Sequence, residues 1–378
     1  MKYNWCYNDI EKEINKLSVM AKEEKDLIKK SYYLRVIDQV SCLLVNNKDV
    51  RITNNQKMNE IINSFNYYCR YYSLIDLYNS TLYKYNKKTE RIVNTYDSIE
   101  EPELFDYRYI THDEALALNY EFFSKTDEEI FKYFNILYKD RYKSIKFSKN
   151  DPTLRDTKDD GNCLFIDGVR KNFININDIQ GLSKVVNLAH ECGHAVANLF
   201  IGNIYDVKDD FLTELASIFF ELAFHNDIGE NIDSFENTLL QFEKMNYFNY
   251  ISDSLLCHQE LIESWKYNEY NVSTNFYRYL KDKYKLKKYD VKECLNTNIE
   301  TSGPYIISYM VALELLHIYK ENKKEAMNIL KRILIKIKSN DSLDIISEFI
   351  PNFTNFNLEI EQLQDKTERE FIKKKILK

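Results

Sequence analysis

Glycine and proline are scarce in this sequence, with 7 and 4 residues among 378. Both residue types interrupt regular secondary structure, so their scarcity favours long helices. Neither occurs before Pro102, which predicts an N-terminal helical region over residues 1–105. Five of the seven glycines lie between Gly161 and Gly202, so the most demanding backbone geometry is expected there.

Other absences narrow the class of protein. The seven cysteines show no CxxC spacing, and the N-terminus has no apolar signal segment, so we expect reduced thiols and a cytoplasmic location. No run of eighteen apolar residues occurs, so no membrane partner is predicted. The net charge of −7 and the pI near 5.6 argue against a nucleic-acid partner. With 44% hydrophobic and 29% charged residues, the composition is that of a globular protein.

The apolar pattern predicts a mainly helical protein. Two capping boxes, at Thr111 and Thr126, each precede an apolar-periodic run. Two short β-like runs flank an Asp167-Gly168 turn, which predicts a hairpin within residues 161–177. Helices are expected over 112–124, 127–145, 183–200 (ended by Gly202) and 210–225, with later interruptions at Pro304 and Pro351. We divide the chain into the N-terminal region 1–105 and a domain over 106–378.

The stretch LAHECGHAV, residues 188–196, carries the clearest chemistry. His190 and His194 are four residues apart and share one face of a helix, so they can hold one metal ion together. Glu191 lies about 100° further around the helix, where it can serve as general base without being a ligand. The surrounding residues are apolar, and buried imidazoles need partners or a metal. The motif predicts a single Zn²⁺ ion per chain.

A catalytic zinc site needs a third protein ligand, which is His, Glu or Asp. The stretch FLTELASIFFELAF, residues 211–224, contains two charged residues, Glu214 and Glu221, seven apart on one face. We predict Glu214 as the third ligand and Glu221 as the acceptor for the other ring N–H of a ligand histidine. Glu221 or Asp210 as the third ligand is the alternative.

These motifs together resemble the M3 metallopeptidases, specifically the oligoendopeptidase F group. The resemblance rests on HECGH (190–194) and ELASIFFE (214–221), and it extends over roughly residues 105–355. It implies a mainly α, helical zinc-metallopeptidase fold, with a small β-sheet or hairpin beside the HExxH helix and an active-site cleft. In GPYIISYMVALEL (303–315) it also implies that Tyr305 and Tyr309 donate to the developing oxyanion.

The sequence departs from that family in three ways. A family histidine before the first tyrosine is replaced by Ile299 and Glu300, a further histidine is Ala197, and the N-terminal region is short. We predict a zinc endopeptidase for short or unfolded peptides, bound along an edge strand at 161–166 or 172–177. The alternatives are a catalytically silent zinc-containing peptide-binding protein and a helical interaction protein with an accidental HExxH. The substrate and the oligomeric state are not predicted.

Overall fold

The structure is a computed structural model that describes residues 109–148, 161–166, 171–179, 181–202, 207–266 and 299–376, with isolated positions before 109. The chain divides into two compact units. One comprises Met1–Asn63 and Asn150–Asp159, and the other comprises Ser64–Lys149 and Asp160–Lys378. Most of the predicted helical region 1–105 lies outside the described residues, and the boundary at 105/106 stays a prediction. Every described helix and strand after residue 109 belongs to the second unit.

The first two helices after residue 109 show which sequence signals were correct. Helix α5 spans His112–Ser124, as predicted, and the Thr111 hydroxyl accepts a hydrogen bond from the Glu114 amide at 3.1 Å. Helix α6 spans Glu128–Lys139 and is capped by Asp127. The predicted cap at Thr126 is therefore wrong. The Asp127 carboxylate accepts amide hydrogen bonds from both Glu129 and Ile130, whereas the Thr126 hydroxyl donates to a carbonyl of the preceding helix.

The predicted helix over 127–145 is also too long. After α6, the short helix α7 (Arg141–Ser144) leads directly into strand β1 (Ile145–Ser148). Strand β1 pairs in parallel with strand β3 (Lys171–Asn177), from Ile145 opposite Ile174 onward. Pairing with a strand that is distant in sequence overrode the local helical pattern, which periodicity alone does not reveal.

The predicted hairpin is confirmed as strands β2 (Gly161–Ile166) and β3, which pair antiparallel with Leu164 opposite Phe173. The Asp167-Gly168 turn lies outside the described residues. The strand order is β1-β3-β2, so β3 is the central strand. The expectation that 172–177 is an edge strand is therefore wrong. The described sheet has two edge strands, β1 and β2, and of the two predicted segments only 161–166 is an edge that could accept a peptide strand.

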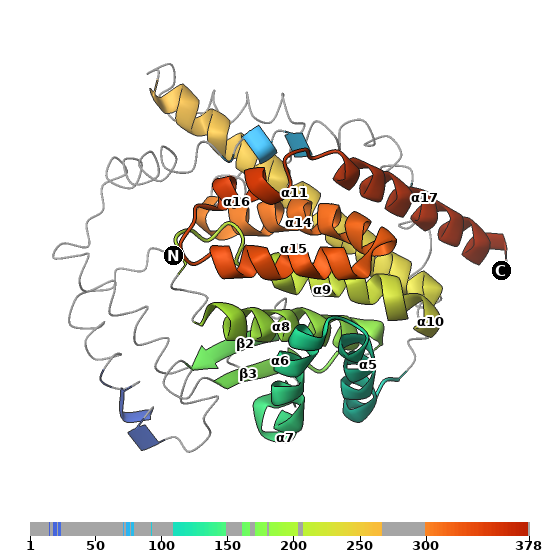
Figure 1. The fold of residues 1–378 in the computed structure, drawn as a ribbon. Coiled ribbons are helices and arrows are strands. Elements are labelled where there is room, and N and C mark those ends of the chain that lie inside the picture. Colours follow the sequence, from blue (N-terminus) through green and yellow to red (C-terminus); the bar gives the residue numbers. More distant parts are fainter. Residues whose placement is uncertain are drawn as a thin grey trace. The chain divides into compact units, whose positions relative to one another are not determined.

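Helix α8 (Leu182–Ile201) carries the HExxH motif and confirms the predicted helix. It lies against β2 and β3 (Figure 1). The Asn172 side chain of β3 donates to the carbonyl of Ala195 at 3.0 Å, and Asn198 donates to the Asn172 side chain at 3.0 Å. Gly202 has a φ of 90° and ends the helix, as its position predicts. These contacts fix the motif helix on the sheet.

Helix α9 (Leu215–Phe224) packs against both α8 and α14 (Ile299–Glu321). Helix α15 (Lys323–Lys336) contacts α14 and α8 (Figure 1). The predicted helix over 210–225 starts too early, because residues 211–214 form turns. After α9 follow the π-helix η5 (His225–Gly229), α10 (Glu230–Ile232) and the long α11 (Ser234–Lys266).

The two late prolines behave differently. Pro304 lies inside α14, so the predicted interruption there is wrong. It is the sixth residue of that helix, so its ring disturbs only the first turns. Pro351 does separate α16 (Ser342–Phe349) from α17 (Asn355–Ile376), as predicted. The fold is mainly helical with one small sheet beside the motif helix, which confirms the predicted fold class. Among the described helices, none has both the length and the apolar composition to cross a bilayer.

Candidate metal centre

The site is built on the contact between α8 and α9. Gly193 lies in the middle of α8, where a Cβ atom would be 2.6 Å from the Ser217 Cα atom and 2.8 Å from the Ala216 carbonyl oxygen of α9. Real Cβ atoms do not approach other atoms so closely, so only glycine allows this helix spacing. This close spacing brings His190 and His194 of α8 near Glu214, the residue directly before α9.

Three of the predicted site residues, His190, His194 and Glu214, lie close together there. The Nε2 atoms of His190 and His194 lie 3.6 Å and 3.1 Å from the same carboxylate oxygen of Glu214. One ligand atom from each residue lies within 4.8 Å of the others. Two imidazoles and one carboxylate are the donor set of catalytic zinc sites with three protein ligands. The residues present therefore fit a zinc ion.

Glu221 lies at the other ring nitrogen of His190. Its carboxylate lies 2.8 Å from His190 Nδ1, and the Lys244 ammonium of α11 forms an ion pair with the same carboxylate oxygen. The Glu221 side chain is only 4% exposed. Since an ionised carboxylate only accepts, Nδ1 carries a proton that it donates to Glu221. Nε2, which faces Glu214, is then the ring nitrogen that a metal ion would bind in place of a proton.

The charges of the site favour a cation. Burial raises the pKa of Glu214, but His194 and His190 outweigh it and hold that pKa well below its ordinary value. Burial also opposes ionisation of Glu221, yet Lys244 and His190 lower its pKa to about 2. Burial and Lys244 lower the pKa of His190, but Glu214 and Glu221 overcome both and raise it to about 9. Two ionised carboxylates thus favour positive charge at the His190 imidazole, where a metal ion would supply it.

Glu191 points to the sheet side of the motif helix. A Cβ atom on Gly161 of the edge strand β2 would lie 3.0 Å from the Glu191 Cγ atom. The Oε2 atom of Glu191 is buried and has no hydrogen-bond partner within the described part of the chain. Burial raises the pKa of Glu191, and the two imidazoles offset this only in part. An unpartnered buried carboxylate beside a metal site is suited to exchange protons with a bound water.

The remaining predicted residues have different positions. Asp210, the alternative ligand, is exposed and does not belong to the group of three donors. Tyr305 is half-buried in α14. Tyr309 is 1% exposed and stacks on Phe248 with ring centroids 4.2 Å apart. Burial and the charge of Glu221 raise the pKa of the Tyr309 phenol, which places this tyrosine within electrostatic range of the site.

Sequence reasoning missed two residues that shape the site, Gly193 and Lys244. A signal for Gly193 was available, because a glycine inside an apolar helix costs about 1 kcal/mol relative to alanine and so indicates close packing. No comparable signal exists for Lys244. It is one of many lysines, and its partner lies 23 residues earlier on another helix.

No protein-family model matches the chain, and no curated protein matches it either. Solved structures do match. The chain is similar to a protein from Chlamydophila abortus named as a peptidase, with a TM-score of 0.59, 15% identity, and coverage of 96% of this chain and 62% of that one. The chain shares that protein's fold. This chain spans about 62% of the length of that protein.

Two further structures are named as oligoendopeptidase F. The one from Bacillus anthracis str. Ames has a TM-score of 0.43 and 15% identity, over 94% of this chain and 64% of that one. The other has a TM-score of 0.49 and 14% identity, over 97% of this chain and 66% of that one. At the level of the fold, the comparison agrees with the resemblance inferred from the sequence.

Proposed function

We propose that this chain is a zinc-dependent endopeptidase that hydrolyses internal peptide bonds of short or unfolded peptides. One observation carries the proposal: His190, His194 and Glu214 converge, while the buried Oε2 atom of Glu191 on the same helix has no partner among the described residues. A structural ion-pair cluster would leave no such carboxylate unpaired, because an orphaned buried polar atom is costly. The peptidase-like fold agrees with this chemistry.

His190, His194 and Glu214 would hold the zinc ion, which when bound lowers the pKa of a water molecule and polarises the scissile carbonyl. Glu191 takes a proton from the attacking water and then delivers it to the leaving nitrogen. Glu221 holds the His190 ring in place and is itself neutralised by Lys244. Tyr305 and Tyr309 are the proposed donors to the carbonyl oxygen as it gains negative charge.

Strand β2 is the proposed place for the substrate backbone. It is an edge of the described sheet, and its first residue, Gly161, lies against Glu191. A peptide added to this edge would be held by backbone hydrogen bonds that do not depend on its sequence. This mode of binding requires an extended chain, which is why short or unfolded peptides are the proposed substrate class.

A second candidate is a catalytically silent zinc-containing peptide-binding protein. The observation that favours it is the absence of the family histidine, with Ile299 and Glu300 at those positions. This candidate shares the metal site and the strand edge with the first. The two differ in turnover alone, so only a hydrolysis assay separates them.

The test is mass spectrometry of a mixed peptide digest, incubated with protein of measured zinc content and with its Glu191→Gln and Glu128→Gln variants. Glu128 is an exposed glutamate in the first turn of α6 and serves as the matched control. We expect internal cleavages with the native protein and with Glu128→Gln, and none with Glu191→Gln. Absence of cleavage by protein that holds one zinc would favour the silent binder. Absence of stoichiometric zinc would reject both candidates.

A further inference from the structure

A second site lies apart from the metal centre. A cavity of about 300 Å³, open to solvent on one side, is lined by residues of α9, η5, α10, α11, α14 and α17, and none of the three proposed zinc ligands lines it. Four leucines form its apolar wall: Leu222, Leu313, Leu316 and Leu363. Its volume is at the lower end of the range for small-molecule sites, which fits a ligand the size of one or two amino acids.

A buried imidazole with one unused nitrogen lines this cavity. His225 is 2% exposed and sits at the start of η5. The Asn237 side-chain amide donates to the His225 carbonyl at 3.1 Å, so its oxygen must be the atom that faces His225 Nδ1. Nδ1 therefore donates, and Nε2 is a bare acceptor with no partner within the described ranges. Such an atom calls for an N–H or O–H donor from a ligand.

Tyr309, which is 1% exposed, also lines this cavity. Its hydroxyl is the proposed donor to the oxyanion at the metal centre, so the ligand of this cavity is held by other groups.

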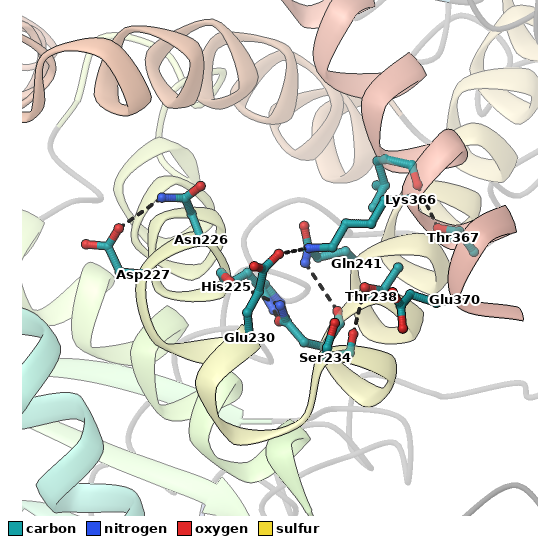
Figure 2. Close-up of polar contacts among 12 residues, drawn as sticks. His225, Asn226, Asp227, Glu230, Ser234, Thr238, Gln241, Lys366, Thr367 and Glu370 are labelled. Atoms are coloured by element: carbon teal, nitrogen blue, oxygen red, sulfur yellow. Dashed lines mark hydrogen bonds and ion pairs between the residues drawn. The ribbon is translucent and has the colours of Figure 1, made fainter. Parts of the chain in front are cut away.

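The charges at the rim are unbalanced. Lys366 of α17 extends to Glu230 of α10, as Figure 2 shows, and Lys320 pairs with Glu359. Arg369, one turn after Lys366, also lines the cavity and is exposed, and no carboxylate in the described part of the chain pairs with it. Arg369 is therefore a cation on the α17 side of the cavity without a carboxylate partner among the described residues. Arginine presents two parallel N–H groups, which match a carboxylate.

We propose that this cavity binds a small zwitterion with an apolar side chain, either a free apolar amino acid or a dipeptide of such residues. Its carboxylate is held by Arg369, its amino group donates to His225 Nε2, and its side chain packs on the leucine wall. Leu222 directly follows Glu221 in α9, so the ligand lies next to the helix that supports the metal centre.

The test is calorimetric titration of the full chain carrying Glu191→Gln, so that hydrolysis does not consume the probes. The probes are L-leucine, L-leucyl-L-leucine, leucinamide, which lacks the carboxylate, and 4-methylpentanoate, which lacks the amino group. We expect saturable binding of leucine or the dipeptide, and the tighter of the two identifies the source of the ligand. Leucinamide and 4-methylpentanoate should bind at least about tenfold more weakly, as loss of a charged hydrogen bond predicts.

Three further variants, made in the same background, locate the site. Arg369→Gln should weaken binding about tenfold or more, and Leu363→Trp should abolish it by filling the cavity. Arg332→Gln, an exposed arginine on α15 away from the cavity, should leave binding unchanged. The proposal is overturned if neither leucine nor the dipeptide binds, or if binding survives both Arg369→Gln and Leu363→Trp. Since zinc and turnover play no part, failure here is independent of the proposed peptidase activity.

Discussion

Replacing Gly193 with alanine tests the helix contact on which the metal centre rests. Alanine is the better helix former by about 1 kcal/mol, so an isolated helix would be stabilised. In this chain the new Cβ would lie 2.6 Å from the Ser217 Cα atom and 2.8 Å from the Ala216 carbonyl oxygen. Both are backbone atoms, so no side-chain rotation relieves the clash. Overpacking of this kind costs about 1–3 kcal/mol, and we expect net destabilisation of about 2 kcal/mol.

The effect on metal binding should be larger than the effect on folding. Non-bonded carbon atoms prefer about 3.5–4.0 Å, so relief of the clash requires α8 and α9 to separate by roughly 1 Å. In the native chain His194 Nε2 of α8 and the carboxylate of Glu214, which directly precedes α9, are 3.1 Å apart, so a separation of the two helices would move them apart. Zinc–ligand distances tolerate deviations of about 0.2 Å. We therefore expect zinc affinity to fall by at least about tenfold.

Denaturant unfolding of the metal-free chain measures the first effect, and competition with a chelator measures the second. Gly202→Ala is the control. Gly202 has a φ of 90°, so alanine there is strained, but among the described residues its Cβ would meet nothing nearer than the Lys338 Nζ atom, at 3.9 Å. That variant should lose stability and keep the zinc affinity. A Gly193→Ala protein with native stability and native zinc affinity would refute the close contact of α8 and α9.

Three other changes probe the surroundings of the site. Lys244→Met should lower the zinc affinity about tenfold in a competition with a chelator. Lys244→Arg should keep most of the affinity, because lysine and arginine both neutralise Glu221. Equal affinities for the native protein and both variants would exclude a role for Lys244. Tyr305→Phe and Tyr309→Phe should each lower kcat about a hundredfold or more with little change in KM if the phenols donate to the oxyanion, and an unchanged kcat removes that residue from the mechanism. Burial lowers the pKa of His225 below its ordinary value of 6.5, so the unfolded chain binds this proton at a higher pH than the folded chain, and the free energy of unfolding should fall as the pH drops below about 6.5. In urea unfolding from pH 7.5 to 5, His225→Gln should show a smaller loss of this free energy with falling pH. An equal loss in both proteins would contradict the shift.

The ligand geometry could be predicted because it is local. His190 and His194 need only helical spacing, which an uninterrupted apolar pattern from 183 to 200 indicates. Glu214 precedes α9, but its φ of −89° and ψ of −3° are close to helical values. It therefore shares a face with Glu221, as the spacing of seven residues indicates. The motif, the following glutamates and the hairpin lie within 61 residues, from Gly161 to Glu221, and short-range patterns carry most of their structure.

The rest depends on contacts between residues far apart in sequence. Strand β1 was expected to be helix because its partner strand begins 26 residues after it does. Pro304 was expected to end a helix, but the packing of α14 on α9 sustains it. The second cavity draws on α9 and α17, whose cavity-lining residues Leu222 and Arg369 are 147 positions apart. No periodicity within one helix encodes which residue of another helix it meets.

This division between local and distant contacts has a consequence for the chemistry. The proposed zinc ligands and the proposed general base come from α8 and from the residue that precedes α9, and Gly193 sets the spacing of these two helices. The charge state of that set is fixed from elsewhere, because Lys244 of α11 neutralises Glu221, which in turn orients His190. We therefore expect metal binding to depend on the docking of α11 on the α8–α9 pair. A fragment that contains only residues 161–224 would keep every ligand of the motif and lose the cation that holds Glu221, so it should bind zinc more weakly than the full chain.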